Sequence, residues 1–373
     1  MARVVLAMSG GVDSSVAAHL LLEAGHEVVG VFMRHGEESS EVCKVEDTGN
    51  TSLPVLGGLA QGRADHKQGC CTASDAADAR RVAARMDIPF YALDLQADFR
   101  RIVDYFVDDY LSGRTPNPCV RCNQWIKFGR LFDYADGVDA EFVATGHYAQ
   151  LVDGELHRGL DSTKDQSYAL FGIRRDRVSR MLLPVGGFEK TRIREIASSL
   201  DLGVAGKKDS QEICFVTQGH HSDFVRAREP KRSQRTSGNF VTVDGEVVGT
   251  HRGYEAFTVG QRKKLGIAMG EPYFVIRIEP ETCNVVIGKK DALASQGLIA
   301  SEANWLVDPA DLPTDVAVQI RYNGQPKPAR MSVDAGDPDR FEVVFDEPEL
   351  AVAPGQAAVV YHGNRVLGGG WIR

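Results

Sequence analysis

The sequence lacks an apolar run of about 18 residues, the length that a membrane-spanning helix needs. Its N-terminal apolar segment, residues 4–8, is short and leads directly into a glycine-rich turn. That pattern indicates a buried first strand rather than a signal peptide. We therefore expect no membrane partner and a cytoplasmic location.

Cysteine is also scarce, with seven in 373 residues. An odd number at irregular spacings in a long chain excludes the disulfide framework of a small secreted domain. We expect the isolated Cys43 and Cys283 to be inert. Cys119, Cys122 and Cys214 remain as the candidates for chemistry.

An excess of positive charge is missing too, because the formal net charge is −8. Taken alone, this argues against a nucleic-acid-binding protein. Basic residues nevertheless gather in three clusters, at residues 173–194, 226–235 and 262–264. Any one cluster is explained as well by a solvated helix face, but the three together favour a polyanion held at one face.

The first half of the chain alternates strand-like and helix-like segments, a pattern typical of a parallel sheet covered by helices. Residues 36–69 interrupt it with little periodicity, and we interpret them as a mobile insertion. After residue 216, short β-rich segments follow one another between Gly, Pro and Asn. We predict an α/β ATP-binding domain (1–216), a small central β-rich domain (217–290) and a C-terminal β-barrel (291–373).

Residues 9–15 form a glycine-rich loop between the first predicted strand and the first predicted helix. Gly10 and Gly11 let the backbone approach an anion, and the N–H groups and dipole of the helix attract it. The lysine of a triphosphate-binding loop is missing. An ordinary turn is the alternative, but the flanking Ser, Asp and Ser match the pyrophosphate loop of enzymes that split ATP into AMP and pyrophosphate. Asp13 is then the natural partner for Mg²⁺.

The C-x-x-C pair Cys119 and Cys122 lies in a loop that two prolines stiffen. Arg114 and Arg121 would favour a reactive thiolate there. The context of a dithiol redox pair is missing, and the adjacent Cys70 and Cys71 are a poor second half of a zinc site. A catalytic or an iron–sulfur role remains open.

Nine short motifs in one order resemble the bacterial tRNA-specific 2-thiouridylase family across almost the whole chain. They are residues 9–16, Asn117-Pro118 with Cys122-Asn123, residues 144–148, 164–168, 209–215, 249–253 and 260–267, Arg321-Tyr322, and Pro354-Gly355-Gln356.

The resemblance implies a reaction in which ATP adenylates the C2 oxygen of the wobble uridine, U34, in tRNAs of the Lys, Glu and Gln type. Cys214 would carry a persulfide supplied by a sulfur-relay protein or a cysteine desulfurase, and its terminal sulfur would attack C2. Cys122 would then release the sulfur and leave a transient disulfide with Cys214. The fold implied is a pyrophosphate-loop domain of the adenine-nucleotide α-hydrolase type, with Asp13 a further catalytic residue.

The same resemblance assigns the binding residues. The ATP contacts are Ala7, Met8, Ser9, Gly10, Gly11, Val12, Asp13, Ser14, Met33 and Gly146. The tRNA contacts are Asn117, Pro118 and Cys119 around the target base, together with His147, Lys164, Asp165, Gln166, Arg321, Tyr322 and Gln356.

Two features depart from the family. Most members have Asp where this chain has Cys119, and the extra thiol suggests a hypothesis in which Cys119, Cys122 and Cys214 hold a [4Fe–4S] cluster. The second departure is the insertion at residues 36–69, which is longer than expected.

Three rival functions are weaker. An amidotransferase-type synthetase would not need Cys122 and Cys214, and a 4-thiouridine synthase would be expected to carry its RNA-binding module before the ATP domain. A catalytically inactive tRNA-binding protein would not need an intact phosphate loop.

Overall fold

The structure is a computed structural model, and it describes residues 1–34, 72–207, 213–216 and 219–373. The predicted insertion, Cys43, Cys70 and Cys71 lie outside the described residues, as do residues 209–212 of the motif that contains Cys214.

A five-stranded, all-parallel sheet forms the centre of the N-terminal part. Its order is β3-β2-β1-β4-β7, so the first strand lies in the middle. Val4, Val5 and Leu6 are fully buried, as expected for a strand covered on both faces. The strands are β1 (Arg3–Ala7), β2 (Glu27–Arg34), β3 (Phe90–Asp94), β4 (Phe142–Ala144) and β7 (Met181–Leu182). The predicted α/β class is confirmed.

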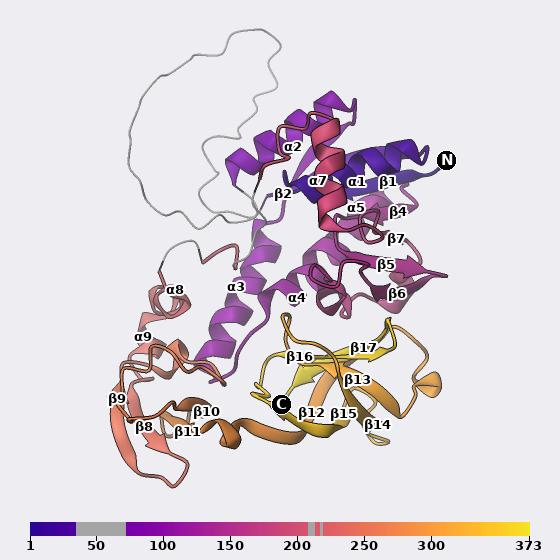
Figure 1. Ribbon diagram of the computed structural model, residues 1–373. Helices are drawn as coiled ribbons and strands as arrows, with labels where there is room; N and C mark the ends of the chain where they lie inside the picture. The colour runs from indigo at the N-terminus through magenta and orange to yellow at the C-terminus, as the bar shows by residue number, and fades with distance from the viewer. Residues whose placement is uncertain (35–71, 208–212, 217–218) are drawn as a thin grey trace, which may run out of the picture.

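Helices cover the two faces of this sheet, and the alternation along β1 decides which side chain meets which layer. Val4 and Leu6 pack with α1, α2 and α7, whereas Val5 and Ala7 pack with α3 and α5 (Figure 1). The helices are α1 (Val12–Glu23), α2 (Ala73–Arg85), α3 (Gln96–Leu111), α4 (Pro118–Cys122), a π-helix η2 (Asn123–Arg130), α5 (Leu131–Gly137), η3 (Ser167–Leu170), α6 (Arg175–Val178) and α7 (Lys190–Ser199).

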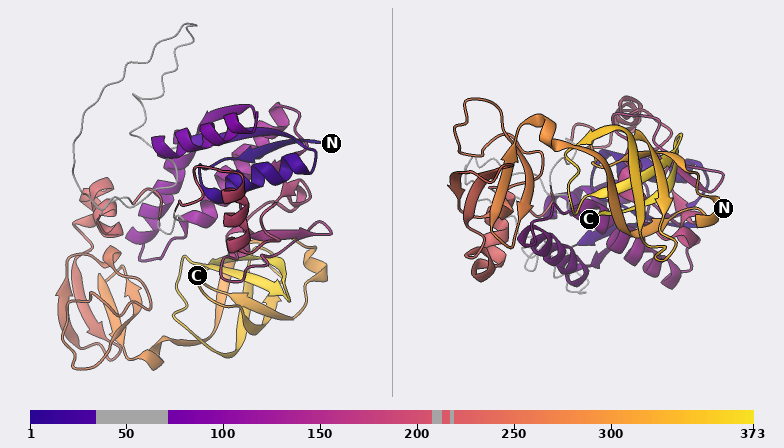
Figure 2. Two further views of the ribbon diagram at one scale, coloured as in Figure 1. Left: turned by 45° about the horizontal axis from the view of Figure 1, so that its top comes forward. Right: turned by 90° about the horizontal axis from the view of Figure 1, so that it is seen from below.

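A second unit follows, built on a four-stranded sheet of order β10-β11-β8-β9. Phe240, Val275, Val285 and Ile287 fill its small core. Its elements are α8 (His221–Arg228), α9 (Pro230–Ser233), β8 (Gly238–Thr242), β9 (Val247–His251), η4 (Tyr254–Ala256), β10 (Phe274–Glu279) and β11 (Asn284–Gly288). Figure 2 shows this unit beside the barrel, below the parallel sheet.

The C-terminal part is a six-stranded antiparallel barrel that the pairing of β12 with β17 closes. The elements are η5 (Lys290–Leu293), β12 (Ala294–Trp305), η6 (Pro309–Asp311), β13 (Asp315–Gln319), β14 (Lys327–Val333), β15 (Phe341–Leu350), β16 (Ala357–His362) and β17 (Arg365–Ile372). The predicted barrel is confirmed. A hairpin from the N-terminal part, β5 (Ala149–Val152) and β6 (Glu155–Arg158), extends its sheet at the edge of β17.

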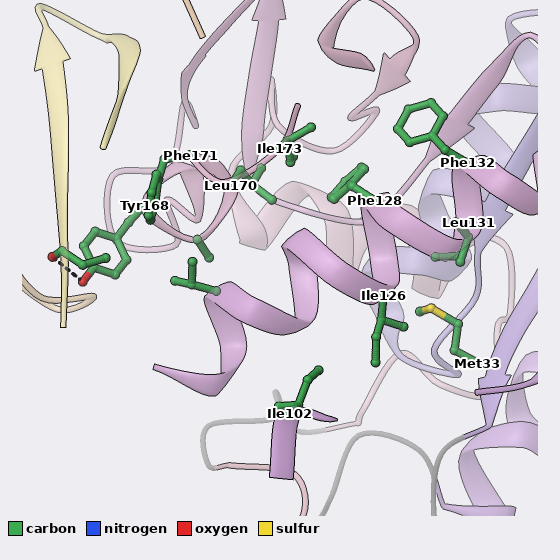
Figure 3. Close-up of a cluster of buried hydrophobic side chains, with 14 of the residues drawn as sticks. Met33, Ile102, Ile126, Phe128, Leu131, Phe132, Tyr168, Leu170, Phe171 and Ile173 are labelled. Carbon is green, nitrogen blue, oxygen red and sulfur yellow. Dashed lines mark hydrogen bonds between the residues drawn. The ribbon is translucent and has the colours of Figure 1, made fainter. Parts of the chain in front are cut away.

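The barrel and the N-terminal part share one hydrophobic core. Val359, Tyr361 and Trp371 of the barrel belong to the same buried cluster as the side chains of α3 and η2. Figure 3 shows Tyr168 pointing towards the barrel, where its hydroxyl donates to the carbonyl oxygen of Ala357 (3.0 Å). The barrel is therefore fixed to the domain that carries the phosphate loop.

Candidate functional site

The phosphate loop connects the buried β1 to α1 and leaves the N-terminus of α1 open. Gly11 is the N-cap residue and no side chain caps this helix. The hydroxyl of Ser14 accepts from the Ser9 N–H (3.2 Å) and donates to the carbonyl of Gly11 (3.2 Å), which ties the loop to the first turn. A phosphate bound here would meet the N–H groups that a helix N-terminus leaves without partners.

Two glycines are required by the packing of this loop. Gly10 has a positive φ of 72°, and a Cβ there would lie 2.1 Å from the carbonyl oxygen of Asp75. At Gly146, just after β4, a Cβ would lie 2.8 Å from the backbone nitrogen of Ser14. Both glycines bring backbone close to the predicted ATP position, and Met33 lies buried near the end of β2.

Asp13 is held between two partners from distant parts of the chain. The Lys190 ammonium donates to both of its carboxylate oxygens (2.8 Å each), and the Tyr148 hydroxyl donates to Oδ1 (2.7 Å). The side chain of Lys190 is only 9% exposed, whereas that of Asp13 is 30% exposed. A carboxylate positioned in this way fits a Mg²⁺ ion bound to pyrophosphate, and the cation beside it fits the phosphates themselves.

Sequence reasoning missed Lys207, which links the phosphate loop to α2. Its ammonium donates to the Gly10 carbonyl (3.0 Å), to the Asp78 carboxylate (2.8 Å) and to that of Asp75. Asp75 also completes the capping box with Thr72 at the start of α2. The neighbouring carboxylates raise the pKa of Lys207 against the effect of its burial, so it stays charged. In the sequence, Lys207 stands out only as positive charge shortly before Cys214, which does not indicate a contact with the phosphate loop.

The cysteine loop, residues 114–122, ends in the short helix α4. Asn117 caps α4 by accepting from the Val120 N–H (3.3 Å), and its own N–H donates to the Tyr105 hydroxyl (3.1 Å). Cys122 is the last residue of α4, and the π-helix η2 starts at the next residue. Such π-helical segments are rare and are frequent at functional sites.

The barrel holds the cysteine loop from the other side. The Thr115 N–H donates to the Pro354 carbonyl (2.8 Å). The Gln356 amide donates to the carbonyls of Thr115 (3.0 Å) and Pro116 (3.1 Å). A Cβ at Gly355, whose φ is 89°, would lie 2.9 Å from the Thr115 oxygen. Gln356, predicted to contact tRNA, therefore braces the loop that carries the cysteines.

The two arginines of the loop are engaged elsewhere and do not serve as free cations beside the thiols. The Arg121 guanidinium stacks 3.9 Å from the ring centroid of Trp371 and donates to Glu302 (2.7 Å). Arg114 pairs with the buried carboxylate of Asp109. Their pairing with Glu302 and Asp109 offsets the positive charge that the sequence placed near the thiols, and activation of a thiolate by these arginines stays a prediction.

None of the three candidate cysteines forms a disulfide in the described part of the chain. Cys119 is exposed, whereas Cys122 and Cys214 are half-buried against the same hydrophobic core. Phe215 anchors the segment of Cys214 by packing on Phe106 of α3 (ring centroids 5.0 Å apart). α3 also contacts α4, so both segments lie against one helix.

The iron–sulfur hypothesis requires the sulfurs of Cys119, Cys122 and Cys214 to converge on one point. Over the described ranges, no group of three or more His, Cys, Asp or Glu side chains is placed to hold a metal ion. The iron–sulfur hypothesis therefore stays a prediction.

Several predicted tRNA contacts gather around Tyr322. Tyr322 is 47% exposed, and its ring lies edge-on to Tyr168. Burial of its hydroxyl raises the pKa of Tyr322, and Gln166, Cys119 and Lys164 lie near enough to act on the phenol. These side chains form a polar rim beside the exposed thiol.

The side chains of three further predicted contacts form hydrogen bonds within the protein. Asp165 accepts from Arg158 (2.8 Å) and from the N–H groups of Gly159 and Ser167 (3.0 Å each). Arg321 donates to the Leu350 carbonyl (2.8 Å) and pairs with Glu349. His147 is buried, and its Nδ1 hydrogen-bonds to the Thr145 hydroxyl (2.7 Å). Burial and the nearby Lys127 ammonium hold the pKa of His147 well below its usual range, so the ring is neutral.

No helix among the described residues is long and apolar enough to cross a membrane.

Three family models match the chain. Residues 2–54 and 56–218 match a tRNA methyl transferase HUP domain. Residues 223–289 match a tRNA methyl transferase PRC-barrel domain, and residues 295–372 match an aminomethyltransferase beta-barrel domain. The first match covers more than half of the chain.

Curated relatives match at full length. A tRNA-specific 2-thiouridylase of Rhodopirellula baltica is 67% identical over 384 aligned residues, which cover 100% of this chain and 96% of the relative. Relatives of the same name from Carboxydothermus hydrogenoformans and Geotalea uraniireducens are 44% and 45% identical, with 99% of this chain covered and 97% and 94% of theirs. The chain belongs to the tRNA-specific 2-thiouridylase family.

Proposed function

We propose that this chain is an ATP-dependent tRNA-uridine 2-sulfurtransferase that converts U34 to 2-thiouridine. One observation carries the proposal. The chain combines an uncapped helix N-terminus at the phosphate loop with a cysteine loop that Gln356 holds in place, and it is related at full length to 2-thiouridylases. ATP is the co-substrate, and Mg²⁺ would be held at Asp13.

The first step activates the uridine. The C2 oxygen attacks the α-phosphorus of ATP, an O–P bond forms, and pyrophosphate leaves. Residues 7–14, Met33 and Gly146 would hold the nucleotide, and Lys190 would offset the charge on the phosphates. The oxygen at C2 then departs as part of AMP, which is a far better leaving group than oxide.

The second step delivers sulfur. The terminal sulfur of a persulfide on Cys214 attacks C2 and AMP leaves. The Cys122 thiolate then attacks the sulfur of Cys214, the S–S bond to the transferred sulfur breaks, and a Cys122–Cys214 disulfide remains. A dithiol reductant reopens that disulfide, and a sulfur-relay protein or cysteine desulfurase reloads Cys214. A cluster on Cys119, Cys122 and Cys214 is the alternative sulfur carrier.

The substrate would be tRNA of the Lys, Glu or Gln type, and the enzyme would act in the cytoplasm. The target base must leave its stack so that its C2 atom becomes accessible, as in other enzymes that modify bases. Asn117, Pro118 and Cys119 would surround it, Tyr322, Lys164 and Gln166 would contact the adjacent nucleotides, and His147, Asp165, Arg321 and Gln356 would support these groups. We also propose the domain boundaries 1–216, 217–290 and 291–373.

The test is direct. Purified protein is incubated with ATP, Mg²⁺, a persulfide donor and unmodified tRNA carrying U34, in air and without oxygen, and 2-thiouridine is measured by mass spectrometry. We expect ATP-dependent product that is lost in C214S and kept in C283S, whose cysteine is half-buried in the central unit. Product that survives in C214S would contradict the proposal, and product only without oxygen would favour the cluster.

A further inference from the structure

Three consecutive cations stand out on the central unit. Arg262, Lys263 and Lys264, here called the basic loop, are all exposed in the connection between β9 and β10 (Figure 1). In the part of the chain that the structure describes, their charged groups have no ion-pair or hydrogen-bond partner. Three uncompensated charges in a row repel one another, which favours a bound anion.

The other two basic clusters of the sequence differ, because carboxylates within the protein neutralise much of their charge. The ion pairs are Arg174 with Asp176, Arg175 with Asp308, Arg177 with Asp133, Arg180 with Asp136, Lys190 with Asp13, Arg192 with Glu195, Arg226 with Glu255, and Arg232 with Asp108. Within the described residues, the basic loop differs from these two clusters in that none of its three cations is paired with a carboxylate.

The basic loop begins next to a contact between the central unit and the barrel. Gly260 packs against Ala351, and a Cβ there would lie 2.7 Å from that of Ala351. Ala351 precedes Pro354, whose carbonyl accepts from Thr115 of the cysteine loop. Gly113 in turn packs on Pro280 of the central unit. The central unit therefore contacts both the barrel and the N-terminal part, and the basic loop begins two residues after Gly260.

A hollow of about 310 Å³ lies next to the basic loop. Arg262 and Lys264 line it together with Met269 and Tyr273. Glu271 lines it as well, but its carboxylate is paired with Lys289 (2.8 Å). Cations beside a half-buried aromatic ring are the combination that binds a phosphate and stacks a base or ribose in RNA.

We propose that the basic loop and this hollow bind the phosphate backbone of the substrate tRNA, beyond the nucleotides that the polar rim around Cys119 would contact. The inference rests on the proposed function, since it takes tRNA as the polyanion. The basic loop supplies affinity and orientation for the RNA and takes no part in the chemistry.

Filter binding of an unmodified U34 tRNA transcript at several salt concentrations tests the proposal. The triple variant R262Q/K263Q/K264Q removes three contacts, so the slope of log affinity against log salt should fall by about 2 to 3. Affinity at moderate salt should fall roughly tenfold or more. The charge-preserving R262K/K263R/K264R should bind like the wild type. The control R174Q/R175Q loses two exposed arginines that are already paired and should keep the wild-type slope.

An unchanged slope in the triple variant would overturn the inference. The proposed function would still be supported if the wild type formed 2-thiouridine. If the wild type bound tRNA but made no 2-thiouridine, the proposed function would fail, and a lost slope would still support the RNA surface. Failure of the wild type to bind tRNA would overturn both.

Discussion

Asp13 and Lys190 show how a single pair can prepare a site for phosphate chemistry. The side chain of Lys190 is nearly buried. It contacts the carboxylate from α7, although the two residues are 177 positions apart in the sequence. We expect the Lys190 ammonium to pair with phosphate oxygens once ATP is bound, because the phosphates carry more negative charge than one carboxylate.

K190M should therefore reduce 2-thiouridine formation by about 100-fold, since losing one preorganised charge contact costs about 3 kcal/mol of transition-state stabilisation. R192M, an exposed change on the same helix, should have little effect. Rates are measured from AMP release at saturating tRNA. Equal rates in K190M and the wild type would show that Lys190 is only a structural partner of Asp13.

Gly10 gives a test of the phosphate loop that depends on geometry alone. G10A should destabilise the protein by about 3 kcal/mol or prevent folding, because it combines a positive φ with a backbone clash. Gly25 also has a positive φ, of 78°, but open space around it. G25A should cost only about 1 kcal/mol in urea unfolding. Equal costs would mean that the loop relaxes easily away from Asp75.

At the scale of elements, the barrel loop at residues 354–356 acts on the cysteine loop without belonging to its domain. Q356L removes two hydrogen bonds to the carbonyls of Thr115 and Pro116. We expect a roughly tenfold lower rate of 2-thiouridine formation and faster alkylation of the exposed Cys119, because the loop samples other conformations. Q150L, which removes a similar bond to the Arg158 carbonyl, is the matched control. Unchanged rates of both processes in Q356L would show that the brace is dispensable.

The junction of α3 with α8 should make stability depend on pH. His221 stacks on Tyr110, and its Nε2–H donates to the Glu255 carbonyl (3.0 Å). Burial, with the neighbouring His220, lowers the pKa of His221 to about 4. The folded state then binds fewer protons than the unfolded state, so stability is full above pH 6.5 and falls as the pH drops towards 4.

At pH 5 this difference amounts to about 2 kcal/mol, which urea unfolding of the wild type and H221Q at pH 7 and pH 5 can measure. Between pH 7 and pH 5, the free energy of unfolding of H221Q should fall by about 2 kcal/mol less than that of the wild type. The same pH dependence in both proteins would contradict a neutral His221.

At the scale of the whole molecule, local patterns predicted much of the fold. The strand at residues 142–144 matches β4, and the phosphate loop lies between β1 and α1 as expected. The three-part architecture also followed from the change to short β segments. Those features depend on neighbouring residues, so periodicity and turn chemistry reveal them.

Features that depend on distant partners were not predictable. β12 carries small and polar residues that do not alternate, and the hairpin β5–β6 joins the barrel through Arg365 and His157. The roles of Lys190, Lys207 and Gln356 arise from contacts across 129 to 241 positions of sequence. The π-helix after Cys122 has no sequence signature, and the fates of Arg114 and Arg121 were decided by where their carboxylate partners lie.

The most direct measurement is the stoichiometry of AMP and 2-thiouridine in one reaction containing ATP, Mg²⁺, a persulfide donor and unmodified U34 tRNA. Adenylation of the C2 oxygen followed by sulfur attack predicts one AMP for each 2-thiouridine, with neither formed when tRNA lacks U34. 2-Thiouridine formed without AMP, or ATP cleaved to ADP, would contradict the proposed chemistry.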